Sequence, residues 1–343
     1  MQIFRGFNQP GLARNSAPAG SGAAGGRALT IGNFDGVHRG HQAMLALLNS
    51  EARHRGVPSC VLTFEPHPRD YFAALAHRPQ LAPARIATLR DKLTELAGCG
   101  VDQCVVLPFD ARLSSQVPEA FIDTVLVAGL QARYVLVGND FRFGAKRAGD
   151  YGMLDAAGNA RGFDVARMNA YEVHGMRVSS SAVREALAAG DMDRAAALLG
   201  RPYSISGHVV HGRKLGRELG FKTLNLRFAH WKPAASGIFA VQVKGLGKEP
   251  VPGVANLGIR PSIDPDDVNG GRVLLETHCL EWPDSLGPEG GYGKIIQVEL
   301  LHKLHDERRY DGLEALTEGI RRDCDDARAF FASTRRQTTR DRI

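Results

Sequence analysis

Residues 28–42 read ALTIGNFDGVHRGHQ, and this stretch decides the fold of the first half of the chain. The run Ala28–Ile31 predicts a short buried strand, and a helical pattern begins near His41. Gly32 and Gly36 lie between strand and helix and allow the backbone to come close to a ligand. In parallel α/β sheets, ligands bind at the carboxyl ends of the strands. The stretch therefore predicts an α/β fold with a ligand site at this turn.

The alternation of strand and helix continues to about residue 200. The strand-like runs are Ala28–Ile31, Cys60–Phe64, Cys104–Leu107, Tyr134–Val137 and Asp164–Met168. The helical stretches are His41–Asn49, Arg85–Ala97, Pro118–Val127 and Asp150–Ala156. Buried apolar strands that alternate with helices predict a parallel, Rossmann-like sheet wrapped by helices. Residues 11–26 are small and flexible in composition, and we expect a mobile loop there.

Two short helices are expected next, over Ala182–Ala189 and Met192–Leu199. Gly200 and Pro202 end helical structure, which places the domain boundary near residue 200 and predicts domains 1–200 and 201–343.

Beyond residue 200 the strands are separated by turns rich in Gly, Pro and Asp. The strand-like runs are His208–His211, Ile238–Lys244, Val251–Leu257, Val273–Leu280 and Lys294–Leu304. This pattern predicts an antiparallel barrel or sandwich. A last amphipathic helix is expected over Leu313–Phe331, because its apolar residues recur at spacings of three and four.

Composition limits the class of protein. The sequence has no run of about 18 apolar residues that could cross a bilayer, and its first residues, MQIFRGFNQP, lack a secretory core. The five cysteines form no CxxC pair, so we expect buried, reduced thiols rather than a zinc knuckle. We therefore expect a soluble, cytoplasmic protein. Its net charge of +6 suits a protein that handles a polyanion, and ATP qualifies as well as nucleic acid, for which no motif is present.

Two histidines carry the chemistry of the first turn. His38 and His41 are three residues apart, so both can face one side of the helix start, where free N–H groups and the helix dipole favour an anion. The chain has no GxxxxGK[ST] loop, and no GxGxxG follows this strand. Such fixed donors can stabilise the negative charge that builds up on the phosphate oxygens when a nucleophile attacks an α-phosphate. There are two alternatives for this pair of histidines. They could bind a metal ion, although the HExxH pattern is absent, or they could be merely structural.

The turn resembles a known signature. GNFDGVHRGHQ is similar to the HxGH motif of HIGH-type nucleotidyltransferases, in the version carried by bacterial FMN adenylyltransferases. Three further segments of that family follow in its order: TFEPHPRD (Thr63–Asp70), VGNDFRFGAKRAGD (Val137–Asp150) and VSSSAVR (Val178–Arg184). The resemblance covers residues 27–200.

This resemblance implies roles for individual residues. His38 and His41 would stabilise the transferring phosphate. The ATP pocket would be formed by Gly32, Asn33, Phe34, Asp35, Gly40 and Asp140, with Ser179, Ser180, Ser181 and Arg184 holding the phosphates. The flavin would contact Phe64, Pro66, Phe141 and Phe143. Taken alone, the serines could be an ordinary helix cap, and Phe141 and Phe143 could belong to the core. Asp140 stands where other members can carry Asn, and its carboxylate could favour Mg²⁺ or bond a hydroxyl.

Two segments of the second half carry possible chemistry. In HGRKLGRELGFKTLNL (His211–Leu226), glycines permit close approach and the basic residues can meet phosphates, although a surface hairpin would look the same. In LETHCL (Leu275–Leu280), Glu276 and His278 share one strand face. A carboxylate there is either a general base for a hydroxyl or an exposed strand residue.

The motif set of this half resembles the riboflavin kinase module, a six-stranded β-barrel with a closing helix, over residues 200–331. The similar segments are GRPYSISGHVVHG, GFKTLN, GVANLGIRPS, LETH and GYGKIIQVELLHKLHDERRYDGLEAL. The resemblance implies that Thr223 and Asn225 bind Mg²⁺ with ATP, and that Glu276 accepts the proton of the ribityl 5′-hydroxyl. The nucleotide would also meet Gly212, Gly216, Gly220 and Lys222. Two positions depart from the family: Lys222 replaces a proline, and His305 replaces an arginine.

Together the two halves predict a bifunctional flavin enzyme. Riboflavin would be phosphorylated to FMN, and FMN adenylylated to FAD, both with ATP and Mg²⁺. The expected partners are ATP, riboflavin and FMN, without nucleic acid or membrane, in a monomer or weak homo-oligomer. The alternatives are a flavin-binding regulator with impaired kinase chemistry, and a nucleotidyltransferase of the same superfamily that acts on another acceptor.

Overall fold

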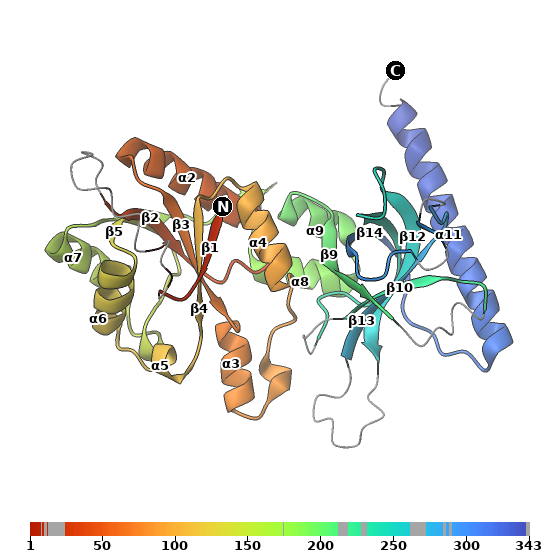
Figure 1. Cartoon of the computed structure of the whole chain (residues 1–343), viewed down its shortest axis with the longest axis horizontal. Coiled ribbons are helices and arrows are strands. Elements are labelled where there is room, and N and C mark those ends of the chain that lie inside the picture. Colours follow the sequence, from red (N-terminus) through yellow and green to blue (C-terminus); the bar gives the residue numbers. More distant parts are fainter. Residues whose placement is uncertain are drawn as a thin grey trace. The chain divides into compact units, whose positions relative to one another are not determined.

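The structure, a computed structural model of the chain, describes residues 1–7, 9, 12, 25–173, 175–211, 219–227, 232–260, 272–283, 286–287 and 290–340 (Figure 1). The predicted loop over residues 11–26 therefore lies almost wholly outside the described residues. The chain folds into two compact units. Unit 1 consists of Met1–Pro83 and Lys92–Ser179, and unit 2 consists of Ala84–Asp91 and Ser180–Ile343.

Unit 1 contains a sheet of six strands. They are β1 (Gln2–Arg5), β2 (Arg27–Ile31), β3 (Ser59–Glu65), β4 (Gln103–Pro108), β5 (Ala132–Gly138) and β6 (Asp164–Met168). The order is β1-β4-β3-β2-β5-β6, and every neighbouring pair is parallel. The predicted parallel sheet is thus confirmed, with β1 as an additional edge strand. The order reverses between β2 and β5, which is the switch point where such sheets bind ligands.

Helices cover both faces of this sheet. They are α2 (Arg39–Arg55), α3 (Pro68–Leu75), η1 (Pro79–Leu81), α4 (Leu89–Gly98), α5 (Ala111–Ser114), α6 (Pro118–Phe121), η2 (Ile122–Gly129), η3 (Ala145–Arg147) and α7 (Tyr151–Arg161), beside the short strands β7 (Glu172–Val173) and β8 (Met176–Arg177). Leu29 and Ile31 of β2 pack in a core with Phe121, Leu126 and other residues of α6, η2 and α7. On the opposite face, the Thr30 hydroxyl lies 3.2 Å from the Met44 sulfur of α2.

Two helix predictions need correction. The helix expected over Arg85–Ala97 begins only at Leu89, because the Thr88 hydroxyl accepts a hydrogen bond from the Asp91 backbone N–H at 3.1 Å and so caps the helix start. The helix expected over Pro118–Val127 is a turn of α-helix followed by the π-helix η2. Helix α3 was not predicted.

Unit 2 is a closed antiparallel barrel, so the barrel and not the sandwich is correct. Its strands are β9 (Tyr203–Val210), β10 (Thr223–Arg227), β11 (Gly237–Lys244), β12 (Val251–Arg260), β13 (Arg272–Cys279) and β14 (Ile295–His305), in the order β10-β13-β12-β11-β14-β9. The helices α8 (Ser180–Ala189) and α9 (Met192–Leu199) belong to this unit, and α9 contacts β9 and β14. The last helix is α11 (Leu313–Arg340).

Helix α11 covers part of the outer face of the barrel. Cys324 and Ala327 of the helix pack against Ala240 of β11 and Val254 of β12. Side chains alternate along a strand, so residues two apart from Val254 share its outward face. The segment Ala84–Asp91 also joins this unit: the Asp91 carboxylate accepts a hydrogen bond from the Ser206 backbone N–H at 3.2 Å, on β9.

All five cysteines are free thiols, and all except the half-buried Cys99 are buried. Within the described residues, no helix combines the length and the apolar character that a membrane span requires.

Candidate active sites

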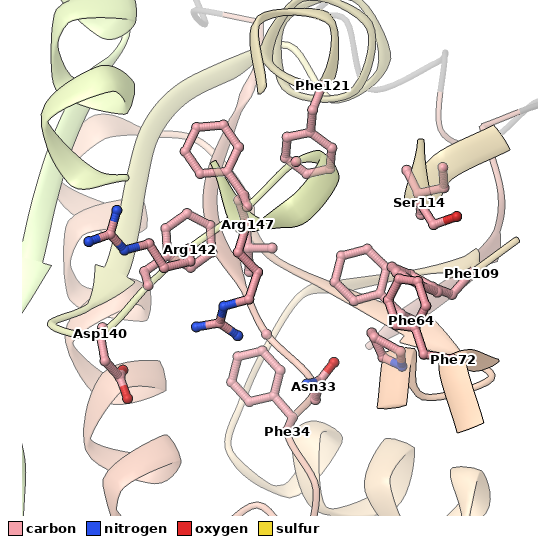
Figure 2. Close-up of a pocket in the computed structure, with 18 of the residues that line it drawn as sticks. Asn33, Phe34, Phe64, Phe72, Phe109, Ser114, Phe121, Asp140, Arg142 and Arg147 are labelled. Atoms are coloured by element: carbon pink, nitrogen blue, oxygen red, sulfur yellow. The ribbon is translucent and has the colours of Figure 1, made fainter. Parts of the chain in front are cut away.

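A cavity of about 660 Å³ opens at the switch point of unit 1 (Figure 2). Residues that follow four neighbouring strands line it: Asn33 after β2, Pro68 after β3, Phe109 after β4 and Asp140 after β5. This volume is within the range of about 300–1,000 Å³ that small-molecule sites occupy. The cavity therefore lies at the carboxyl ends of the strands, where the first turn predicts a ligand site.

The turn after β2 is tight. Phe34 is 1% exposed and has a φ of 49°, a left-handed conformation that is rare for a bulky residue. A Cβ on Gly32 would lie 3.1 Å from the Phe34 ring, and one on Gly40 would lie 3.3 Å from the His38 ring. These two glycines therefore let aromatic rings pack against the backbone. Of the predicted ATP residues here, Gly32, Asn33 and Phe34 line the cavity, whereas Asp35 is buried in the turn.

The two histidines stack on each other. Their ring centroids are 3.7 Å apart at an angle of 14°, and the His38 Nδ1 accepts a hydrogen bond from the His41 backbone N–H at 3.3 Å. His38 is thus the cap of α2 and lies buried, while His41 lines the cavity. Burial lowers the pKa of His41 well below its usual value, and the nearby His38 and Lys92 act in the same direction. His41 is therefore a neutral imidazole near pH 7.

Aromatic rings form one wall of the cavity. Phe64 and Phe109 meet edge to face with centroids 5.8 Å apart, and Phe72 of α3 contacts Phe109 at 5.7 Å. Phe141 and Phe143 also line the cavity and stack at 5.5 Å. Phe143 is 6% exposed, so it is both a core residue and part of the lining. The predicted Phe64, Phe141 and Phe143 are thus brought together, whereas the predicted Pro66 is not among the lining residues.

The segment after β5 adds positive charge. Arg142, Lys146 and Arg147 all line the cavity, and Figure 2 shows the Arg147 guanidinium reaching between the aromatic rings and Phe34. Lys146 and Arg147 both have left-handed backbone conformations, with φ of 55° and 57°. Asp140 is exposed and lies 3.7 Å from the Arg177 guanidinium. These three cations, Phe72 and Phe109 are not among the site residues predicted from the sequence, although the cations lie within the family-like segment Val137–Asp150.

The four residues predicted to hold the phosphates of ATP do not all belong to the same unit. Ser179 ends unit 1, while Ser180, Ser181 and Arg184 belong to α8 of unit 2. The Arg184 Nε donates to the Ala84 carbonyl at 2.7 Å within unit 2. The role of these four residues toward phosphate stays a prediction.

In unit 2, the predicted kinase residues share one face of the barrel. Asn225 of β10 pairs in register with Glu276 of β13, and Thr223 pairs with His278. Residues that are directly opposite each other in an antiparallel pair project to the same side. Val254, which packs on α11, also pairs with His278, so this is the outer face. Gly220 turns the chain before β10 with a φ of 87°, and the predicted Gly212 and Gly216 lie outside the described residues.

Asn225 has a feature expected of a metal ligand. It is 3% exposed, and its buried Oδ1 has no hydrogen-bond partner among the described residues. Leaving a buried acceptor unpaired costs about 1–3 kcal/mol, which a bound ligand can offset. Amide and hydroxyl oxygens are ligands that Mg²⁺ accepts, so Asn225 and Thr223 fit the ion. The described residues hold no cluster of three or more His, Cys, Asp or Glu arranged to bind a metal.

Both departures from the family pattern have local partners. The Lys222 ammonium lies 5.3 Å from the ring centroid of Trp282, and the Lys222 carbonyl lies 2.9 Å from the His278 Nδ1. Burial lowers the pKa of His278, so its neutral ring can donate to that carbonyl. His305 Nε2 lies 2.7 Å from the Asp323 carboxylate of α11. The two substituted side chains therefore hold the loop and the helix that flank this face.

Two family models match the chain, one in each half. The FAD synthetase model matches residues 22–182, and the riboflavin kinase model matches residues 199–331. The fold and the two sites thus define a two-module class, in which a nucleotidyltransferase is joined to a flavin kinase.

Curated relatives carry both modules in one chain. An Escherichia coli K12 protein is 45% identical over 307 residues, which are 90% of this chain and 93% of the relative. A Pseudomonas fluorescens protein is 43% identical over 332 residues, which are 97% of this chain and 98% of the relative. Both are described as bifunctional riboflavin kinase/FMN adenylyltransferase. The chain therefore belongs to the family of bifunctional riboflavin kinases/FMN adenylyltransferases.

A solved structure shares the fold of the whole chain. It is described as a macrolide-efflux protein from Streptococcus pneumoniae, with a TM-score of 0.70 and 23% identity. The match covers 96% of this chain and 99% of the other. At that identity the likeness concerns the fold alone.

Proposed function

We propose that this chain makes FAD from riboflavin in two ATP-dependent steps. The barrel of unit 2 transfers the γ-phosphoryl group of ATP to riboflavin, which gives FMN and ADP. Unit 1 transfers the adenylyl group of a second ATP to FMN, which gives FAD and pyrophosphate. The observation that carries the proposal is the cavity of unit 1, where a neutral histidine, a helix start, aromatic rings and three cations line one space.

In the adenylyl transfer, an FMN phosphate oxygen attacks the α-phosphorus of ATP. The new P–O bond forms as the bond to the pyrophosphate leaving group breaks, and negative charge develops on the α-phosphate oxygens. The neutral imidazole of His41 and the N-terminal N–H groups of α2 are donors suited to that charge. His38 acts through His41, because its cap and ring stacking fix where the His41 ring lies.

The other walls suit the flavin. The isoalloxazine ring is flat, and the Phe64, Phe72 and Phe109 cluster offers ring faces and edges for it. Lys146 and Arg147 offer cations for the FMN phosphate or the leaving pyrophosphate. Asn33 and Asp140 supply polar groups for the nucleotide, as the resemblance implied.

In the phosphorylation, Glu276 accepts the proton of the ribityl 5′-hydroxyl. The oxygen of that hydroxyl attacks the γ-phosphorus of ATP, and ADP leaves. Glu276 lies beside Asn225 in register, so base and nucleotide ligands occupy adjacent strands. Thr223 and Asn225 would hold Mg²⁺, which neutralises phosphate charge when bound. Lys222 and Gly220 shape the turn that leads into β10.

A complementation assay tests both sites in one experiment. The double variant His38→Ala, His41→Ala should convert riboflavin to FMN and stop there. The variant Glu276→Ala should make FAD only when FMN is supplied. A mixture of the two variants should make FAD from riboflavin and Mg-ATP. If either variant lost both activities while still folded, the assignment of two separate sites would be wrong.

A further inference from the structure

A row of side chains crosses the outer face of the barrel at the level of Glu276. Glu276 of β13 pairs in register with Asn225 of β10 on one side and with Asn256 of β12 on the other. Directly opposed residues project to the same side of a sheet, so the three side chains stand in one line. Asn256 carries a carboxamide that the assigned chemistry does not use.

Asn256 has an open acceptor. Its Oδ1 is buried and has no hydrogen-bond partner among the described residues, as is also true of the Oδ1 of Asn225. The row continues through Ile238 of β11 to His305 of β14. Ile238 is apolar and packs toward α11, and His305 is bonded to Asp323. Asn256 is thus the last group of the row, within the described part of the chain, that offers a free acceptor.

The row also separates Asn256 from the proposed metal site. Neighbouring strands lie about 4.8 Å apart, so the backbones of Asn225 and Asn256 are about 10 Å apart across Glu276. Strand side chains stand roughly perpendicular to the sheet, and those on the outside of a barrel diverge. One ion with ligand distances of about 2.1 Å on Thr223 and Asn225 would not reach Asn256.

In-line transfer orders the reactants along this row. The attacking oxygen and the leaving oxygen lie on opposite sides of the transferred phosphorus. With the nucleotide and its ion at β10 and the base at β13, the acceptor alcohol lies toward β12. An unpaired amide oxygen beside the base is suited to receive a hydrogen bond from a second hydroxyl of the same acceptor.

We propose that the Asn256 Oδ1 accepts a hydrogen bond from a ribityl hydroxyl next to the one that is phosphorylated. Asn256 is then an acceptor-binding residue that aligns the 5′-hydroxyl with Glu276. It also favours polyhydroxylated chains over simple alkyl alcohols. The inference rests on the proposed kinase function and adds the side of the barrel on which riboflavin lies.

The test compares two flavins that differ only in these hydroxyls. One is riboflavin, and the other carries a 5-hydroxypentyl chain, which keeps the terminal hydroxyl alone. In Asn256→Ala, kcat/KM for riboflavin should fall roughly 3- to 10-fold, the worth of one neutral hydrogen bond, while the KM for ATP stays unchanged. The hydroxypentyl flavin should react equally well with the variant and the unchanged protein.

The controls separate this role from others. Asn256→Asp keeps an acceptor oxygen and should keep the preference for riboflavin. Asn225→Ala should raise the Mg²⁺ and ATP requirement and leave the ratio between the two flavins unchanged. An equal loss with both flavins in Asn256→Ala, a raised KM for ATP or an unchanged rate would each overturn the proposal. If the unchanged protein phosphorylated neither flavin, the kinase function itself would fail, and this inference with it.

Discussion

Replacing His41 by alanine should slow adenylyl transfer by about 10²–10³ and spare phosphorylation. His41 lines the cavity of unit 1, and its ring is held by stacking on His38 at 3.7 Å. Because burial keeps its pKa well below the usual value, the ring offers a neutral donor rather than a diffuse positive charge. Removal of one such donor typically lowers kcat by about 10²–10³, equivalent to roughly 2.7–4 kcal/mol of transition-state stabilisation.

The assay measures FAD from FMN and FMN from riboflavin in the same preparation. The matched control is His54→Ala, an exposed histidine in the last turn of the same helix α2, which should leave both rates unchanged. Because the kinase site is built from β10 and β13 of the other unit, FMN formation reports only that unit 2 of the His41 variant has folded, and the far-UV circular dichroism of the variant, compared with that of the unchanged protein, reports the folding of unit 1. A fall of less than about tenfold in FAD formation would refute the donor role that we assign by analogy with fixed oxyanion donors.

Three further perturbations test the kinase base, the aromatic wall of the cavity and the buried histidines. Glu276→Gln should lower FMN formation by about 10²–10⁴, the range for loss of a general base, with FAD formation from supplied FMN kept. Phe109→Ala should raise the KM for FMN several-fold, and this rise corresponds to the roughly 0.5–1.5 kcal/mol that one aromatic pair contributes. The KM for ATP in the same step should not change. The unfolding free energy should fall as the pH drops below about 6.5, by at most about 1.4 kcal/mol per pH unit for each proton. The reason is that the unfolded chain protonates His41 and His278 while the folded chain, in which burial lowers both pKa values, does not; urea titrations of His41→Gln at pH 7.5 and 5.5 should show a smaller fall.

Local patterns were sufficient for the class of each unit. The apolar runs from Ala28–Ile31 to Tyr134–Val137 lie within β2 to β5, because strands buried on both faces are continuously apolar. The run Asp164–Met168 forms the edge strand β6, which has no buried residue. The edge strand β1 was missed because three of its four residues are exposed, so it lacks that signal. Strand order, and with it the switch point between β2 and β5, depends on pairing between distant segments that no local pattern records.

The site residues were likewise only partly predictable from local sequence. His38 and His41 lie in one contiguous motif, and the sequence alone identified both. Phe72 and Phe109 are isolated residues that follow different strands, and only the sheet brings them together at 5.7 Å. Asn256 became a candidate only through its register with Glu276. Lys222 and His305, which depart from the family pattern, have specific partners in Trp282 and Asp323.

One chain carries two successive transfers, each with its own site. The most direct measurement is a time course of riboflavin, FMN, FAD and pyrophosphate after Mg-ATP is added to the purified chain. FMN should rise first, and FAD should follow with one pyrophosphate released per FAD. The absence of FMN, or FAD that forms without FMN as an intermediate, would show that the two transfers do not follow one another on this chain.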